Sequence, residues 1–266
     1  MRIMIGNITA IYRRELQSYF ASPLAYAIAG LFWLLGGFFL TVILLSPQGL
    51  IAQVAMADQF GGGSASIDVP YEFLKIYLSL LGSLSMFVLP ILSMGLYAEE
   101  RKQGTLELLA TSPITNWAVA LGKLLGVVTF YITIVLPLMA CEAIALSTSD
   151  PPIQPIGMLL GHAGLILLAA SILSLGMFVS CLTESTVFAA IMTFALVLLL
   201  WVIDAIAEGL GGGWGDILSH LSLLNHYNDF TQGVLDTSGL LLFITYIALG
   251  LFLTAQAIDA LRFQRS

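Results

Sequence analysis

Most of the residues that could take part in chemistry lie close together, in the stretch EERKQGTLELLATSPI from Glu99 to Ile114. Five charged side chains of both signs fall between Glu99 and Glu107, although charged residues make up only 9% of the chain. Mixed charge on a surface favours binding of another protein, because opposite charges steer and orient the partner. The stretch therefore predicts a protein-docking surface. The alternative is a stop-transfer loop, but its acids contribute little to membrane orientation.

The same stretch predicts a short helix with its own start and end. Gly104 is suited to end the preceding helix, because glycine readily adopts the left-handed conformation found there. Thr105 is suited to be the N-cap of the short helix, and Pro113 to the first turn of the helix that follows. A helix from Thr105 to Ser112 is therefore expected. The residues predicted to contact the partner are Glu99, Glu100, Arg101, Gly104, Thr105, Leu106, Glu107, Leu109 and Pro113.

Three further ionisable residues, Glu142, His162 and Asp204, fall inside apolar segments. Such residues are functional candidates, because a charge in hydrocarbon is costly. They predict a polar outer vestibule, or a contact for a substrate or a proton. The alternative is that each lies within a turn or two of the outer surface and reaches water. Lys123 is expected to extend its ammonium group to the inner surface in the same way.

Several other kinds of chemistry are not indicated by the sequence. A P-loop requires G-x-x-x-x-G-K-[ST], and the one Gly-Lys pair, Gly122-Lys123, is followed by leucine inside an apolar segment. Cysteine–histidine metal motifs are absent, and His220 and His226 share a helix face only loosely. The net charge of −7 argues against nucleic acid as a partner. We therefore expect no metal, no cofactor and no enzyme activity in this chain.

The elements that must position these residues are membrane-spanning helices. Hydrophobic residues make up 59% of the chain and the mean hydropathy is +0.98, whereas soluble domains carry about 25% charged residues. A helix needs about 20 apolar residues to cross a bilayer. The predicted fold class is thus an all-α integral membrane protein, one transmembrane domain over residues 1–266. Its six predicted spans are 24–45, 73–98, 117–146, 157–182, 187–207 and 240–261.

The positions of lysine and arginine predict that both termini lie inside, because all of them except Lys75 then fall at or near the cytoplasmic side. Residues 1–23 predict an amphipathic elbow helix along the membrane surface, or else an extension of the first span. Its polar face is expected to carry Arg13, Arg14 and Glu15. On the outer side, the glycine-rich segment 46–72 is predicted to form a flexible loop. The segment 208–239 is predicted to form one or two short helices that dip into the membrane.

Small residues predict where helices approach one another closely within a membrane. In the second span, Ser79, Gly82, Ser83 and Met86 lie along one helical face. In the first span, Gly30, Gly36 and Gly37 are expected to have the same role.

The segment YAEERKQGTLELLATSPITNWAVALGKLL resembles the conserved region of ABC-2-type transporter permeases, whose pattern is E-x-x-x-G-T-L-E-x-L-x-x-x-P-[VI] with a later G-K. The segments RRELQSYFASPLAY and HYNDFTQGVLD are similar to the gliding-motility-type and nitrous-oxide-reductase-maturation-type subgroup. The matching positions of the main pattern are Glu100, Gly104, Thr105, Leu106, Glu107, Leu109, Pro113, Ile114, Gly122 and Lys123.

This resemblance implies a permease subunit in a bacterial inner membrane that works as a homodimer. A separate ATPase subunit would bind ATP and magnesium and would contact the helix Thr105 to Ser112, which would be a coupling helix. A periplasmic auxiliary subunit is a further implied partner. The implied activity is ATP-driven export. Two alternatives stay open: a membrane anchor that transmits force without carrying a solute, and a secondary transporter that uses Glu142 or Asp204 as a proton site.

Overall fold

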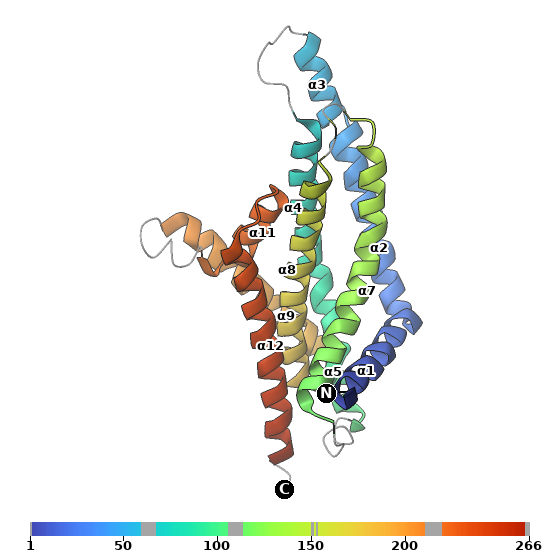
Figure 1. Cartoon of the computed structure of the whole chain (residues 1–266), viewed down its shortest axis with the longest axis vertical. Coiled ribbons are helices and arrows are strands. Elements are labelled where there is room, and N and C mark those ends of the chain that lie inside the picture. The colour runs from blue at the N-terminus through green and yellow to red at the C-terminus, as the bar shows by residue number, and fades with distance from the viewer. Residues whose placement is uncertain are drawn as a thin grey trace.

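The computed structural model describes residues 2–59, 68–105, 114–149, 152, 154–210 and 220–263, and in these ranges the regular structure is entirely helical. The helices form an elongated bundle (Figure 1). Six helical segments of the described part are long and apolar enough to cross a membrane. The helices are α1 (Arg2–Ala21), α2 (Pro23–Leu45), α3 (Leu50–Gln59), α4 (Val69–Ser93), α5 (Gly95–Lys102), α7 (Asn116–Ala145), α8 (Pro155–Cys181), α9 (Thr186–Leu210), α11 (Leu223–Thr231) and α12 (Thr237–Phe263).

The predicted spans agree with α2, α7, α8, α9 and α12 to within a few residues at each end. The first residues of α1 and the last residues of α12 lie at the same end of the bundle, and α3 lies at the opposite end (Figure 1). These are called the termini end and the distal end below. An even number of spans requires this arrangement. Which end faces the cytoplasm stays a prediction.

Helix α8 is the centre of the bundle and the most deeply buried of the six spans. Its serines bond to the backbone of α12: the Ser171 hydroxyl donates to Phe243 O, and the Ser174 hydroxyl donates to Tyr246 O, both at 3.3 Å. Gly250 lies directly against the backbone of Ser174. Close packing and hydrogen bonds of this kind hold helices together in lipid, where hydrophobic burial between helices supplies no driving force.

The predicted second span, 73–98, lies within one helical segment, Val69–Lys102, that is long and apolar enough to cross a membrane. The segment has one irregularity, at Met94, where α4 and α5 meet. Helix α4 ends at Ser93, and α5 begins at Gly95 after a single intervening residue, Met94. Pro90 lies in the last turn of α4, where it removes one backbone donor and favours a break. The short helix α5 therefore follows this irregularity, at the termini end.

The segments at the distal end differ in part from the prediction. The sequence predicts a loop over 46–72, but Leu50–Gln59 forms α3, while the glycine-rich FGGGSAS lies outside the described residues. The alanines and long apolar side chains of α3 favour helix over loop. A short helix within 208–239 is confirmed as α11. The Tyr227 hydroxyl of α11 donates to Leu78 O of α4 at 2.5 Å, so α11 is anchored inside the bundle.

The small residues predicted to permit close packing fall into two groups. A Cβ atom at Gly36 would clash with Leu138, and one at Gly82 would clash with the ring of Tyr227, so both glycines do pack closely. At Gly30 and Gly37, no described atom lies within 4 Å of the position that a Cβ atom would take, so both are open in the single chain. The prediction is therefore wrong for these two within one chain.

Candidate functional site

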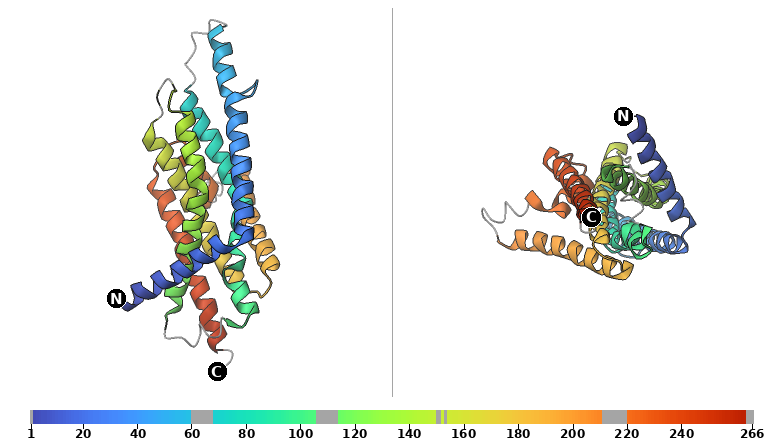
Figure 2. Two further views of the ribbon diagram at one scale, coloured as in Figure 1. Left: turned by 90° about the vertical axis from the view of Figure 1, so that its right-hand side faces the viewer. Right: turned by 90° about the horizontal axis from the view of Figure 1, so that it is seen from below.

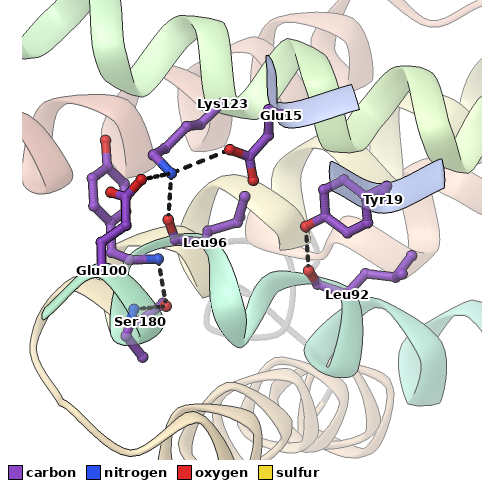
Figure 3. Close-up of polar contacts among 9 residues, drawn as sticks. Glu15, Tyr19, Leu92, Leu96, Glu100, Lys123 and Ser180 are labelled. Atoms are coloured by element: carbon purple, nitrogen blue, oxygen red, sulfur yellow. Dashed lines mark hydrogen bonds and ion pairs between the residues drawn. The ribbon is translucent and has the colours of Figure 1, made fainter. Parts of the chain in front are cut away.

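The ammonium group of Lys123 is the centre of a buried polar junction at the termini end. It donates to Glu15 Oε2 of α1 at 3.2 Å, to Glu100 Oε1 of α5 at 3.0 Å and to Leu96 O at 2.7 Å (Figure 3). These three acceptors use all three donors of the ammonium group. The side chain of Lys123 is 4% exposed, so the expected extension to water is wrong. Two carboxylates and a carbonyl solvate the charge instead.

Two glycines on α7 allow α1 to reach Lys123. A Cβ atom at Gly122 would lie 2.9 Å from Ile11 Cβ, and one at Gly126 would lie 2.8 Å from Glu15 Cβ. Helix α1 therefore crosses α7 at close range (Figure 2), as in other small-xxx-small helix contacts. The two residues of the Gly-Lys pair have different roles. Gly122 allows the backbone of α1 to approach α7 closely, and Lys123 binds Glu15 of α1. Gly126 was missed, although the spacing G-K-L-L-G was visible in the sequence.

The end of α1 is fixed by Tyr19. Its hydroxyl donates to Leu92 O of α4 at 2.7 Å (Figure 3), and its ring stacks on Phe130 of α7 with the ring centroids 5.1 Å apart. Arg13 and Arg14 are exposed, as expected for the polar face of an elbow helix. Glu15 was assigned to that polar face and instead points inward to Lys123, because the acid finds a buried cation there.

Helix α5 is attached to the end of α8 by Ser180. Its hydroxyl accepts hydrogen bonds from Tyr97 N at 3.1 Å and from Ala98 N at 3.0 Å, and it donates to Met94 O at 2.7 Å. The first amides of a helix have no partner within that helix. A residue about 80 positions away along the chain therefore satisfies two amides in the first turn of α5, as an N-cap residue normally does.

Two of the four charged side chains of α5 bind within the protein and two are exposed, although Glu99, Glu100 and Arg101 were all predicted to contact a partner. Glu100 binds Lys123, and Arg101 Nη1 donates to Cys181 O at 3.0 Å. Arg101 Nε also lies 3.6 Å from a carboxylate oxygen of Glu184. Glu99 and Lys102 are exposed. The two inward side chains fix α5 to α7 and α8, and the two outward ones are accessible to a partner.

Replacing Ser180 with alanine tests this attachment. We expect Ser180→Ala to destabilise the protein by about 2 kcal/mol, because two buried amides lose their acceptor. Hydrogen exchange should show faster exchange of the α5 amides, with α12 unchanged. Ser180→Thr keeps the hydroxyl and should retain slow exchange of the α5 amides, although its added methyl group at this fully buried position also costs stability. Ser83→Ala is the matched control, since that exposed serine bonds only within its own helix. Slow exchange of α5 in Ser180→Ala would contradict the assignment.

The end of α5 is as the sequence predicts, whereas the predicted N-cap role of Thr105 stays a prediction. Gly104 has a φ of +71° and follows the C-cap residue Gln103, so it ends α5 in the left-handed conformation. The Thr105 hydroxyl donates back to Glu100 O at 3.2 Å. The remaining predicted contact residues, Leu106, Glu107, Leu109 and Pro113, lie outside the described residues. The coupling helix Thr105 to Ser112 therefore stays a prediction.

The junction carries one more negative than positive charge. Burial raises the pKa of the Glu15 carboxyl, and the Lys123 ammonium opposes this rise only in part. One oxygen of Glu100, Oε2, is buried and has no hydrogen-bond partner among the described residues. A cavity of about 130 Å³ adjoins the three charges and is also lined by Arg14 of α1 and Glu99 of α5. The junction is thus a polar contact that borders a cavity lined by α1, α5 and α7.

The outer ionisable residues are arranged differently from the prediction. His162 Nε2 lies 3.3 Å from Glu142 Oε1, and both side chains are buried between α7 and α8. His162 Nδ1 lies 2.9 Å from Met158 O. The pair neither reaches water nor lines an open vestibule in the single chain. Asp204 belongs to α9, but its side chain is outside the described part of the structure.

Comparisons with known proteins agree with this architecture. A family model described as ABC-2 family transporter protein matches residues 68–210, which are more than half of the chain and include α4, α5, α7, α8 and α9. A search of curated proteins gave no match. The matched region contains Lys123, Glu100 and Ser180 and therefore most of the junction described above. The chain belongs to the ABC-2 transporter family of multi-pass membrane proteins.

Proposed function

We propose that this chain is the permease subunit of an ATP-driven exporter and that a separate ATPase subunit docks at its termini end. The family assignment supports a permease, and the Lys123 junction supports the coupling. Lys123 joins α1, α5 and α7 in a buried contact, and the chain leaves α5 directly into the segment expected to bind the ATPase. The termini end would then face the cytoplasm.

In this proposal α5 transmits motion from the ATPase to the bundle. A force on the segment after Gly104 would act on α5, which is bonded to α8 through Ser180 and to α7 through Glu100 and Lys123. The same lysine passes the displacement to α1 through Glu15. Directional polar contacts can exchange between two arrangements without unpacking the apolar core. ATP binding and hydrolysis in the partner would therefore move α1, α5 and the inner ends of α7 and α8 together.

The proposal includes a second copy of the chain. The side chains of α2 and α9 that face away from the bundle are large and apolar, among them Leu34, Phe38, Leu199 and Trp201. In a membrane such faces meet lipid or another helix. The Glu142–His162 pair is closed inside one chain, so an export path would run between two copies rather than through one. A bacterial inner membrane is the location that this arrangement would require.

Docking and transmission can be separated by experiment, because α5 has outward and inward charges. We expect Glu99→Lys combined with Glu107→Lys to reduce co-purification of the ATPase about tenfold, since reversed charges repel a complementary surface. Glu100→Gln should leave co-purification intact and reduce permease-stimulated ATP turnover, because it weakens only the internal contact. Glu72→Lys, at the distal end, is the control and should change neither. Undiminished co-purification of the Glu99→Lys, Glu107→Lys variant would overturn the docking site.

A force-transmitting anchor that carries no solute is the second candidate. The closed Glu142–His162 pair favours it, because that pair offers no open polar path within a chain. Labelling of cysteines placed along α2 and α9 during ATP turnover would distinguish the two. A water-accessible stripe that appears with ATP indicates export, and protection along the whole length indicates the anchor.

A further inference from the structure

A second polar cluster lies at the junction of α11 and α12, away from the Lys123 junction. His226 Nδ1 is 3.7 Å from Asp229 Oδ2 and 4.0 Å from Asp236 Oδ2. These three atoms all lie within 4.8 Å of one another. His226 is only 7% exposed, and its Nδ1 is buried without a hydrogen-bond partner among the described residues. A buried, unpartnered nitrogen that faces two carboxylates requires a physical explanation.

The other ring nitrogen of His226 determines what Nδ1 can bind. Nε2 lies 3.3 Å from the backbone oxygen of His220. A carbonyl oxygen only accepts hydrogen bonds, so Nε2 carries a hydrogen and donates it. In the neutral ring Nδ1 then has a lone pair, which points toward the two negatively charged aspartates. A lone pair and two anions around one point repel one another unless a cation lies between them.

We propose that His226, Asp229 and Asp236 bind a divalent transition-metal ion such as zinc. One imidazole nitrogen and two carboxylate oxygens form a donor set that zinc accepts, with water in the remaining position. Metal-binding histidines generally donate the second ring nitrogen to a carbonyl or carboxylate, and His226 does this toward His220 O.

The distances are somewhat longer than such an ion requires. Donors that each lie about 2.1 Å from a tetrahedral zinc ion are about 3.4 Å apart. The distances of 3.7 Å and 4.0 Å from the histidine nitrogen to Asp229 and Asp236 therefore have to shorten by roughly 0.3–0.6 Å. The two aspartate oxygens lie within 4.8 Å of each other and need to approach by up to about 1.4 Å. Both aspartate side chains are more than 40% exposed, so they are free to make this movement and to leave one side open for water.

The local fold brings together residues that are separated in sequence. The turn after α11 is closed by Gly233, whose φ is +75°, and by a hydrogen bond from Val234 N to Asp229 O at 2.9 Å. Gly239 in the first turn of α12 leaves space for the imidazole, because a Cβ atom there would lie 3.1 Å from His226 Cβ. The ion would link α11, which is anchored in the bundle through Tyr227, to the start of the last span.

The test uses the full-length chain in lipid nanodiscs, stripped with chelator and titrated with zinc chloride by calorimetry. We expect one zinc ion per chain. Asp229→Asn and Asp236→Asn should each weaken binding about tenfold or more, because loss of residues that only support a ligand already costs about 10–100-fold. Asparagine keeps an oxygen that can accept from Ser238 N, at 3.1 Å from Asp236 Oδ1, but it loses Oδ2, which accepts from the Ser238 hydroxyl. The unfolding temperature of the Asp236→Asn variant without zinc is therefore measured first, to show that the variant is folded.

Two control variants address non-specific binding. Asp68→Asn changes an exposed carboxylate that caps α4 by accepting from Tyr71 N, and His220→Gln removes an exposed imidazole but keeps the backbone oxygen. Both should bind zinc as the wild type does. Zinc should also raise the unfolding temperature of the wild type but not of Asp236→Asn. Absence of zinc binding by the wild type would contradict the proposal. Equal binding by the aspartate variants would place zinc elsewhere, and either result overturns the site.

Discussion

Replacing Lys123 with methionine is expected to destabilise the protein by about 3–5 kcal/mol, because removal of one partner from a buried ion pair leaves the other charge uncompensated. Here two carboxylates, Glu15 and Glu100, lose their shared cation, and Leu96 O loses its donor. Methionine fills a similar volume, so packing changes little. The apparent unfolding temperature in detergent should fall by roughly 10 °C.

The explanation that unpaired carboxylates cause this loss of stability can be tested directly. The triple variant Lys123→Met, Glu15→Gln, Glu100→Gln removes the cation together with both charges and should recover most of the lost stability. Lys75→Met, at a partly exposed lysine of α4, should change stability by less than about 0.5 kcal/mol. If the triple variant is no more stable than Lys123→Met, the effect comes from packing and not from unpaired carboxylates.

The second large effect is expected at Gly250, where α8 and α12 touch. A methyl group there would lie 2.6 Å from the carbonyl carbon of Ser174 and 2.7 Å from its oxygen. These are backbone atoms and cannot rotate away, so Gly250→Ala must separate the two helices. We expect a loss of about 3 kcal/mol, at the upper end of the cost of overpacking. The hydrogen bonds from Ser171 and Ser174 to α12 should lengthen as well.

The matched control for this substitution is Gly37→Ala in α2. Apart from its own turn of helix, no described atom lies within 4 Å of its Cβ position, so the methyl group meets no described side chain and no other helix. Alanine also favours helix over glycine by about 1 kcal/mol. Thermal unfolding should therefore show Gly37→Ala to be at least as stable as the wild type. Equal unfolding temperatures for the two alanine variants would contradict close contact between α8 and α12.

The helices could be predicted from the sequence because a chain in lipid must satisfy its backbone hydrogen bonds within each spanning helix. Long apolar runs therefore mark the spans almost to the residue, as in α7 and α8. The turn at Gly104 could be predicted for a similar reason, since it depends on local backbone preference. Helix α3 is encoded by LIAQVAMADQ, whose composition favours a helix, but the glycine-rich segment that follows favours a loop, so the two signals conflict over 46–72.

The junction could be predicted only in part, because its contacts join distant positions. Glu15 and Lys123 are 108 residues apart, and nothing local distinguishes an acid that meets a buried lysine from one that faces water. The same holds for Ser180, which caps a helix formed much earlier in the chain. The sequence suggests only a loose pairing of His226 with His220 on one helix face. That Asp236 lies near His226 could not be predicted, because the turn between them depends on the backbone conformation at Gly233.

The order of the Lys123 contacts along the chain has a consequence for biosynthesis. Proteins are made from the N-terminus, and α1 and α5 both precede α7. Glu15 and Glu100 are therefore synthesised, and leave the ribosome, before Lys123 does. A lysine entering the bilayer alone carries an insertion penalty of up to about 3 kcal/mol. Glu15 and Glu100, which pair with this lysine in the folded chain, both belong to helices that are made earlier. Pairing with these acids would offset the cost of inserting the lysine with the third span.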